Sequence, residues 1–173
     1  GGRRHRGDRH ASDRHRRHDG APAAGRVVRL VVIDLIPALL SWEGRDRSSD
    51  PDVPPDAAHT LEHLYGWFRV VGIADAGESS TELRSHLERE DLAVFFESIS
   101  TSAEFGPRVS PRVVRRVVAA LGGPDDRTAL VTSREHLVAA FGAARIPVVF
   151  TSQEEFAGVP DAVAALLDGR VSP

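Results

Sequence analysis

The segment RVVRLVVIDLIPALL, residues 26–40, decides the fold. Residues 26–34 form a nearly continuous run of β-branched and aliphatic side chains, which is typical of a parallel strand buried on both faces. Asp34 ends this run. Ligands of open parallel sheets bind beyond the carboxyl ends of the strands, so Asp34 is the first candidate for a functional residue.

Strand-like and helix-like segments alternate along the rest of the chain. Apolar runs typical of strands recur at residues 68–74, 92–100, 128–132 and 147–150. Strands that alternate with helices are typical of βαβ units and of parallel sheets. We therefore expect an α/β fold with a doubly wound parallel sheet of about five strands, formed by residues 26–173 as one domain.

Helix-start signals precede the segments between these strands. Ser, Thr and Asp cap helix N-termini, a Glu three residues later completes a capping box, and proline is favoured at the first helical position. The predicted starts are Asp56, Ser79 with Glu82, Ser110 before Pro111, Thr132 with Glu135, and Pro160.

Composition excludes several kinds of chemistry. The sequence has no cysteine, which excludes disulfides and thiolate metal sites, and no lysine, which excludes a Schiff-base lysine. It contains no GxGxxG after the first strand and no GxSxG, so dinucleotide binding and serine-hydrolase chemistry lose their usual support. No apolar run reaches the roughly 18 residues of a membrane span. We therefore expect a cytoplasmic protein without membrane contact.

Residues 1–25 differ in character from the rest. Within residues 3–20 there are seven arginines, three aspartates and four histidines, without apolar periodicity. Such a segment is predicted to be a disordered, basic tail. It is a candidate for contact with a polyanion such as RNA, or with an acidic protein surface, or it serves only to increase solubility.

Four segments at the predicted strand ends carry a resemblance to a known family. Across residues 28–168 they resemble, in order, the four motifs of the haloacid-dehalogenase-like (HAD-like) superfamily. The segments are VVIDLIPAL at 31–39, GIADAG at 72–77, SAEFGPRVSP at 102–111, and VTSREHL at 131–137. The resemblance implies a HAD-like Rossmann-type fold, with Asp34 in the position of the carboxylate nucleophile that attacks phosphorus.

The first two motifs have lost polar groups that the family uses. Ile36 stands where the family has the aspartate that donates and accepts the proton, and such a group is worth about 10²- to 10⁴-fold in rate. The first-motif threonine is replaced by Ala38. Ala74 stands where a hydroxyl binds phosphate, and the next residue, Asp75, would repel a phosphate unless a cation intervened.

The third and fourth motifs are changed as well. No lysine follows the Ser-Ala-Glu-x-Gly lead-in, so the charge would have to come from Arg108 or Arg112, and an arginine is not equivalent to a lysine there. Ser133 and Leu137 stand where the family has acids that complete a magnesium site. Glu135 is the one nearby acid in this motif that could compensate.

The candidate site residues follow from these positions. We expect Asp34 to be catalytic if the protein is an enzyme, with Asp34, Asp75 and Glu135 as the metal ligands. Arg134 is predicted either to face solvent or to contact an anion, and Trp42 and Trp67 to belong to the core or its cover. The candidate ligand-binding residues are Asp75, Arg108, Ser110, Thr132, Ser133 and Arg134.

Residues 41–55 occupy the place where the family inserts a cap. The segment is short, polar and rich in proline and aspartate, so no helical cap domain fits in it. We expect a mobile loop over the site and a domain that is capless or has only a short loop cap.

Three functions remain open at this point. The first is a non-catalytic HAD-like domain, with no cofactor, that binds a protein partner or a ligand at the former active site and regulates or scaffolds. The second is a HAD-family hydrolase that uses Asp34 as nucleophile, either as a weak phosphatase with Mg²⁺ or as a metal-free enzyme resembling the dehalogenases. The third is nucleic-acid binding through the arginine-rich tail. The accumulated losses at Ile36, Ala74, Ser133 and Leu137 favour the first.

Overall fold

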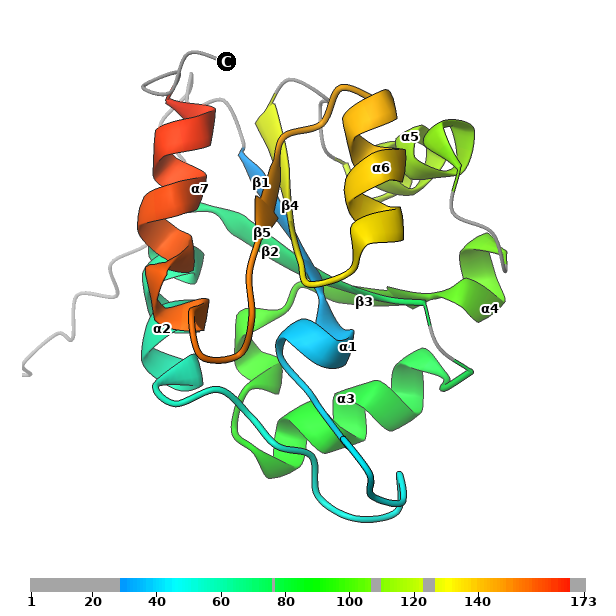
Figure 1. The fold of residues 1–173 in the computed structure, drawn as a ribbon, viewed down its shortest axis with the longest axis vertical. Coiled ribbons are helices and arrows are strands. Elements are labelled where there is room, and N and C mark those ends of the chain that lie inside the picture. Colours follow the sequence, from blue (N-terminus) through cyan, green and yellow to red (C-terminus); the bar gives the residue numbers. More distant parts are fainter. Residues whose placement is uncertain (1–28, 76, 107–109, 123–126, 169–173) are drawn as a thin grey trace, which may run out of the picture.

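A five-stranded parallel sheet forms the centre of the domain. The computed structural model describes residues 29–75, 77–106, 110–122 and 127–168. The strands are β1 (Leu30–Asp34), β2 (Arg69–Ala74), β3 (Ser98–Thr101), β4 (Thr128–Thr132) and β5 (Val148–Phe150). Their order is β3-β2-β1-β4-β5, with every neighbouring pair parallel (Figure 1). The predicted doubly wound α/β fold is confirmed.

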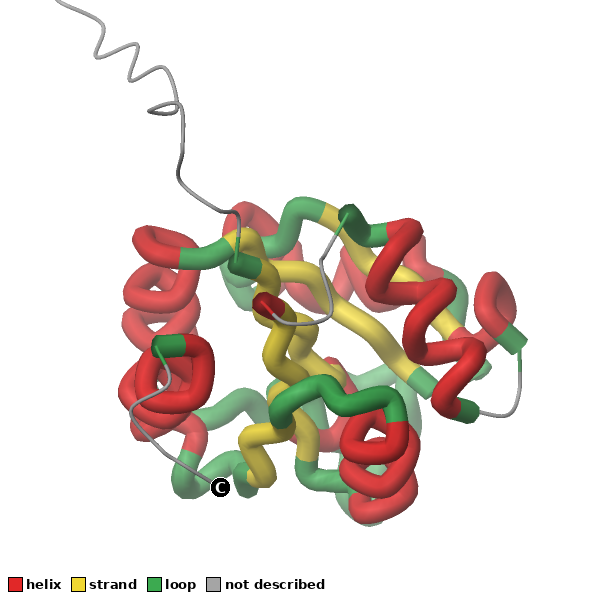
Figure 2. The backbone as a smooth tube through the Cα atoms, turned by 90° about the horizontal axis from the view of Figure 1, so that it is seen from above, coloured by secondary structure: helices red, strands yellow, loops and turns green. Residues whose placement is uncertain are grey.

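Helices cover both faces of the sheet (Figure 2). Helices α2, α3 and α7 pack on one face, and α5 and α6 pack on the other. Two short helices, α1 and α4, follow β1 and β3 directly. The helices are α1 (Leu35–Ala38), α2 (Ala57–Trp67), α3 (Ser80–Arg89), α4 (Ser102–Phe105), α5 (Pro111–Ala120), α6 (Glu135–Ala143) and α7 (Val159–Leu167), with 3-10 turns η1 (Ala93–Phe95) and η3 (Phe156–Gly158).

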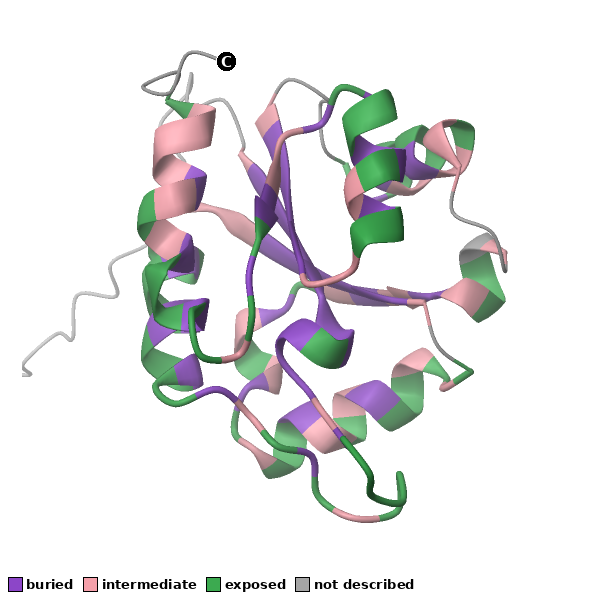
Figure 3. Ribbon diagram, viewed as in Figure 1, coloured by how far each residue is buried: buried purple, intermediate pink, exposed green. Residues whose placement is uncertain are grey.

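The central strand is buried over its whole length (Figure 3). Val31 and Ile33 face the layer of α2, α3 and α7, whereas Leu30 and Val32 face α5 and α6. This two-sided burial explains the continuous apolar run, because neither face of β1 meets water. At Gly72 in β2 an added Cβ would lie 2.9 Å from a methyl group of Leu35. The missing side chain therefore lets α1 pack closely against β2.

One predicted strand is wrong in its extent. Residues 92–100 were expected to be extended throughout, but the 3-10 turn η1 occupies residues 93–95, and β3 begins only at Ser98. Leu92 and Phe96 are buried, whereas Val94 between them is exposed. A spacing of four residues between buried positions suits a helical turn better than a strand, whose side chains alternate.

The predicted helix starts are partly confirmed. Ser79 and Glu82 form a complete capping box at α3, and Ser110 caps α5 by accepting a hydrogen bond from the Val113 N–H. Pro160 lies in the first turn of α7. Asp56 precedes α2 but makes no side-chain cap, since its backbone is left-handed, with φ of 59°.

Removing the Ser79 cap is expected to cost about 1 kcal/mol in the free energy of unfolding. The Ser79 hydroxyl accepts from the Glu82 N–H, and a lost N-cap typically costs this amount. Urea denaturation of Ser79→Ala measures the loss, with Ser80→Ala on the same helix as the matched control. Equal stability of the two variants would contradict the capping role.

None of the helices in the described ranges is long and apolar enough to cross a membrane. The tail predicted for residues 1–25 lies outside the described residues, and so does Arg108.

Candidate functional site

The candidate site lies at the carboxyl end of the sheet, between two neighbouring strands. Asp34 is the last residue of β1, and Thr132 is the last residue of β4, its hydrogen-bonded neighbour. The chain runs from β1 outward to β2 and β3 on one side, and later to β4 and β5 on the other. The carboxyl ends of β1 and β4 therefore mark the topological switch point of the sheet, which is where open α/β sheets bind ligands.

Asp34 is fully buried, and both of its carboxylate oxygens are hydrogen-bonded. Oδ2 accepts from the Thr132 hydroxyl at 2.7 Å and from Arg134 Nε at 2.8 Å. Oδ1 accepts from Arg134 Nη2. The guanidinium thus binds the carboxylate through two parallel N–H donors, the strongest geometry for this kind of ion pair.

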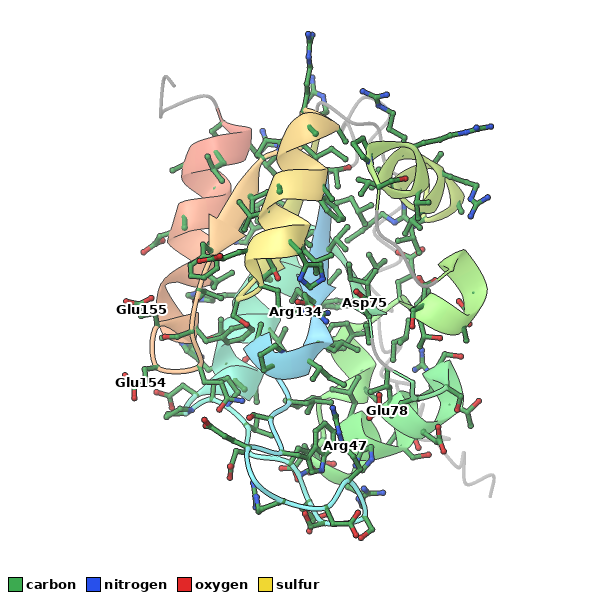
Figure 4. The ribbon with its side chains drawn as sticks, turned by 45° about the vertical axis from the view of Figure 1, so that its right-hand side comes forward. Arg47, Asp75, Glu78, Arg134, Glu154 and Glu155 are labelled. Atoms are coloured by element: carbon green, nitrogen blue, oxygen red, sulfur yellow. The ribbon has the colours of Figure 1, made fainter. Side chains whose placement is uncertain are left out.

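Arg134 is the residue that immediately precedes α6. Its side chain points inward and lies beside Asp75 (Figure 4). Its side chain is only 19 % exposed, and Nη1 donates to the main-chain oxygen of Asp75 at 3.1 Å. Of the two expectations for Arg134, the solvent-facing one is therefore wrong. An anionic group does attract this side chain, but the anion is the protein's own Asp34.

Thr132 connects the two charged residues. Its Oγ1 donates to Asp34 and accepts from the backbone N–H of Arg134 at 3.0 Å. The predicted capping box of Thr132 with Glu135 is wrong, because helix α6 begins at Glu135 and the hydroxyl is engaged on the Asp34 side. This hydroxyl fixes the turn after β4 that directs Arg134 toward the carboxylate.

Opposing effects act on the ionisation of Asp34. Burial raises the pKa of the Asp34 carboxyl, because the charged form loses its hydration. The hydrogen bonds and the charge of Arg134, together with the Thr132 hydroxyl, act in the opposite direction. The ion pair therefore offsets part of the cost of placing a carboxylate in the core.

The acidic neighbours predicted as metal ligands do not converge on Asp34. The Asp75 carboxylate lies 3.2 Å from Nε2 of His136, at the rim of the site, and His136 is more than half exposed. Glu135 is exposed at the first residue of α6. Leu137 is fully buried in the core beneath α6. Asp34 is thus the one buried carboxylate among the predicted ligands.

The remaining candidates have separate roles or none that the structure assigns. Ser110 caps α5 and is engaged there. The Ser133 hydroxyl is buried, and it has no hydrogen-bond partner in the described structure. Ile36, at the position of the family's general acid, is 8 % exposed and packs in the core.

These residues do not fit a magnesium ion. Mg²⁺ requires near-octahedral coordination by oxygen ligands, whereas both oxygens of Asp34 are engaged and a guanidinium lies against them. Within the described ranges, no three His, Asp or Glu side chains are grouped so that they could hold a metal ion. A fixed cation from the protein therefore stands beside Asp34, where the resemblance to HAD enzymes implied a metal.

The cap-position segment, residues 41–55, is a mostly exposed loop. It contains no helix, and an antiparallel bridge between Ser41 and Asp52 joins its ends. Trp42 is buried and donates from Nε1 to the Ser49 carbonyl at 2.8 Å. Arg47 lies 4.5 Å from the centre of the Trp42 ring and pairs with Glu78, which precedes α3 (Figure 4). The loop is therefore anchored near the start of α3, without forming a cap domain.

The two tryptophans differ in environment. Trp42 belongs to the core, as expected, whereas Trp67 at the end of α2 is 75 % exposed, so of the two places expected for it, the core or its cover, the core is excluded. Trp67 instead lines an open cavity of about 320 Å³ with Arg29 and Asp168. Arg29 immediately precedes β1, so this cavity lies at the end of β1 opposite to Asp34.

Several solved structures that share this fold are HAD hydrolases. A haloacid dehalogenase-like family hydrolase from Xanthomonas campestris is 17 % identical, with a TM-score of 0.59 over 72 % of this chain and 60 % of that one. A subfamily IA HAD-superfamily hydrolase from Geobacter sulfurreducens is 14 % identical, with a TM-score of 0.57 over 72 % and 89 %. The cobalt-bound deoxy-D-mannose-octulosonate 8-phosphate phosphatase from Haemophilus influenzae is 13 % identical, with a TM-score of 0.56 over 82 % and 90 %.

The chain has a HAD-like fold, as the sequence resemblance predicted. No protein-family model and no curated protein sequence matches it. The structural similarity to the Xanthomonas protein covers three fifths of that protein's length. At these identities the likeness concerns the fold, so activity has to be argued from the residues at the site.

The pairing of Arg134 with Asp34 is the feature that sequence reasoning missed. Both residues were candidates, but for different ligands, and they are 100 positions apart. A signal was present in the fourth motif, where an arginine directly follows a position at which the family carries a metal-binding acid. This adjacency places a cation near the carboxyl end of β4, but it does not identify the group that the side chain contacts.

Proposed function

We propose that this HAD-like domain does not catalyse phosphoryl transfer and acts as a regulatory or protein-binding domain, with Asp34 as a structural carboxylate. The observation that carries the proposal is the bidentate pairing of Asp34 with Arg134. A nucleophilic carboxylate needs a lone pair directed at phosphorus. Here Oδ1 faces one guanidinium nitrogen, and Oδ2 is engaged by a second guanidinium nitrogen and by a hydroxyl.

The surroundings of Asp34 support the same proposal. The side chain at the general-acid position, Ile36, cannot transfer a proton, and no step of acid–base catalysis can be assigned to it. Asp75 lies at the rim against His136, where it is paired with an exposed imidazole. No cofactor is required by this arrangement, because Arg134 supplies the positive charge that the buried carboxylate needs.

Exposed apolar side chains support the binding half of the proposal. Tyr65 and Val94 are 57 % and 70 % exposed, and the Tyr65 ring lies edge-on to Phe95 at 6.2 Å between centroids. Tyr65 comes from α2, and Val94 and Phe95 come from η1. Exposed apolar side chains on two neighbouring elements offer apolar surface to a protein partner.

Purified protein is expected not to hydrolyse an aryl phosphate above background in the presence of Mg²⁺. The loss of the general acid alone lowers the reaction rate by about 10²- to 10⁴-fold. The hydrogen bonds and ion pair that engage the nucleophile lower the rate further. A steady-state assay of the parent and of Asp34→Ala, purified in parallel, separates contaminating phosphatase from intrinsic activity. Turnover that is present in the parent and abolished in Asp34→Ala would move the protein into the class of active hydrolases.

A further inference from the structure

Two histidines lie one turn apart on the outer surface of α2. His59 and His63 are both exposed, and their ring centroids are 4.9 Å apart with an interplanar angle of 40°. We propose that His59 and His63 chelate a late first-row transition-metal dication such as Ni²⁺, Cu²⁺ or Zn²⁺. This site is separate from the Asp34 pair and does not depend on the function proposed for it.

The separation of the two rings fits simultaneous binding of one ion. An imidazole nitrogen binds Zn²⁺ at about 2.0–2.1 Å, which places the ring centre roughly 3.2 Å from the metal. Two rings bound at angles between about 90° and 110° then have centroids about 4.5–5.2 Å apart. The distance of 4.9 Å lies inside this interval.

The helix holds this spacing in place. Side chains four residues apart are neighbours on an α-helix, and His59 and His63 lie within an uninterrupted helix from Ala57 to Trp67. The opposite side of α2 is fixed to the core by buried residues, including Leu61 and Leu64. Because the backbone is already ordered, metal binding has to restrict only the two imidazole side chains.

The chemistry of the donors selects the ion. Imidazole nitrogen suits Zn²⁺, Cu²⁺ and Ni²⁺, whereas Mg²⁺ prefers carboxylate, carbonyl and water oxygen. Within the described ranges no third His, Asp or Glu completes a group with these two. Since both rings are exposed, water can fill the remaining coordination positions.

The test has to separate this pair from the other histidines of the chain. His86 packs edge-on against Trp42, and His136 pairs with Asp75, so both serve as internal controls. Four more, His5, His10, His15 and His18, belong to the N-terminal segment and could bind metal themselves. Replacing these four with glutamine in the full-length chain gives a background in which His59 and His63 can be tested.

Thermal melts of this background protein at pH 8 are expected to show a Tm rise of about 5 °C in millimolar Ni²⁺ relative to chelator. A rise of this size is produced when an ion binds only the native state and its concentration is far above the dissociation constant. The rise should be abolished in His59→Ala and in His63→Ala, retained in His136→Ala, and absent with Mg²⁺. Comparing metal with chelator within each variant removes any change in its baseline stability. Absence of the rise, or its persistence in either alanine variant of the pair, would overturn the proposal.

Discussion

Replacing Arg134 with alanine is expected to lower the free energy of unfolding by about 3–5 kcal/mol, the usual cost of leaving one partner of a buried ion pair alone. Asp34 has no exposed surface, so its carboxylate cannot recover hydration when the guanidinium is removed. For a domain of this size the loss corresponds to a Tm decrease of about 10 °C or more. Arg115→Ala, at an exposed position of α5, is the matched control and should change stability by less than about 0.5 kcal/mol.

The cost of Arg134→Ala should also depend on pH. Arg134 opposes the rise in the pKa of Asp34 that burial causes, so its removal lets that pKa rise further. The native state then binds this proton more readily than the unfolded state does, and stability falls as pH rises through the native pKa. The deficit relative to the parent should therefore be largest near neutral pH and shrink on acidification. A deficit that grows on acidification would contradict the role assigned to the guanidinium.

Removing both charges is expected to restore part of this loss. The double variant Asp34→Ala with Arg134→Ala leaves no buried carboxylate, so it should be more stable than Arg134→Ala alone by about 2 kcal/mol. The single variant Asp34→Ala should cost less than Arg134→Ala, because the guanidinium is 19 % exposed and can turn toward solvent, whereas the carboxylate cannot. Urea denaturation of the four proteins at pH 7 measures this coupling.

Additivity of the two single substitutions would contradict the account. It would mean that Asp34 and Arg134 contribute independently, and that the carboxylate is satisfied by other groups. Asp34→Asn is a useful fifth protein, because it keeps the shape and one acceptor while removing the charge. Asp34→Asn should lose less of the free energy of unfolding than Arg134→Ala does, since a neutral amide needs no counter-charge.

The sheet could be predicted from the sequence because its centre is buried on both sides. β1 and β4 are buried at every position, and their sequences are nearly continuous apolar runs. Such runs are not expected in an amphipathic helix or in a strand with one face in water. The segment before β3 was mispredicted for a related reason. Residues 92–96 form an equally apolar run, and only the tertiary packing determines that Val94 faces solvent while Leu92 and Phe96 are buried.

The position of the candidate site was predictable, but its contacts were not. The fold class predicts that the site lies at the carboxyl ends of the strands. Asp34 and Thr132 are the last residues of β1 and β4, so they lie together at that end of the sheet. The direction of the Arg134 side chain depends on the turn that the Thr132 hydroxyl fixes before α6. The spacing of residues along the sequence carries no information about that turn, so Arg134 could be recognised as a cation at the site but not as the partner of Asp34.

The most direct test of the central claim, that Arg134 and not a metal ion neutralises Asp34, is a thermal melt of the parent protein in chelator and in millimolar Mg²⁺, with Asp34→Asn melted alongside. An ion that binds only the native state must raise its Tm. We expect the parent protein to have the same Tm in both conditions. A Mg²⁺-dependent rise in the parent that is abolished in Asp34→Asn would show that the carboxylate still binds a metal, and would contradict the account.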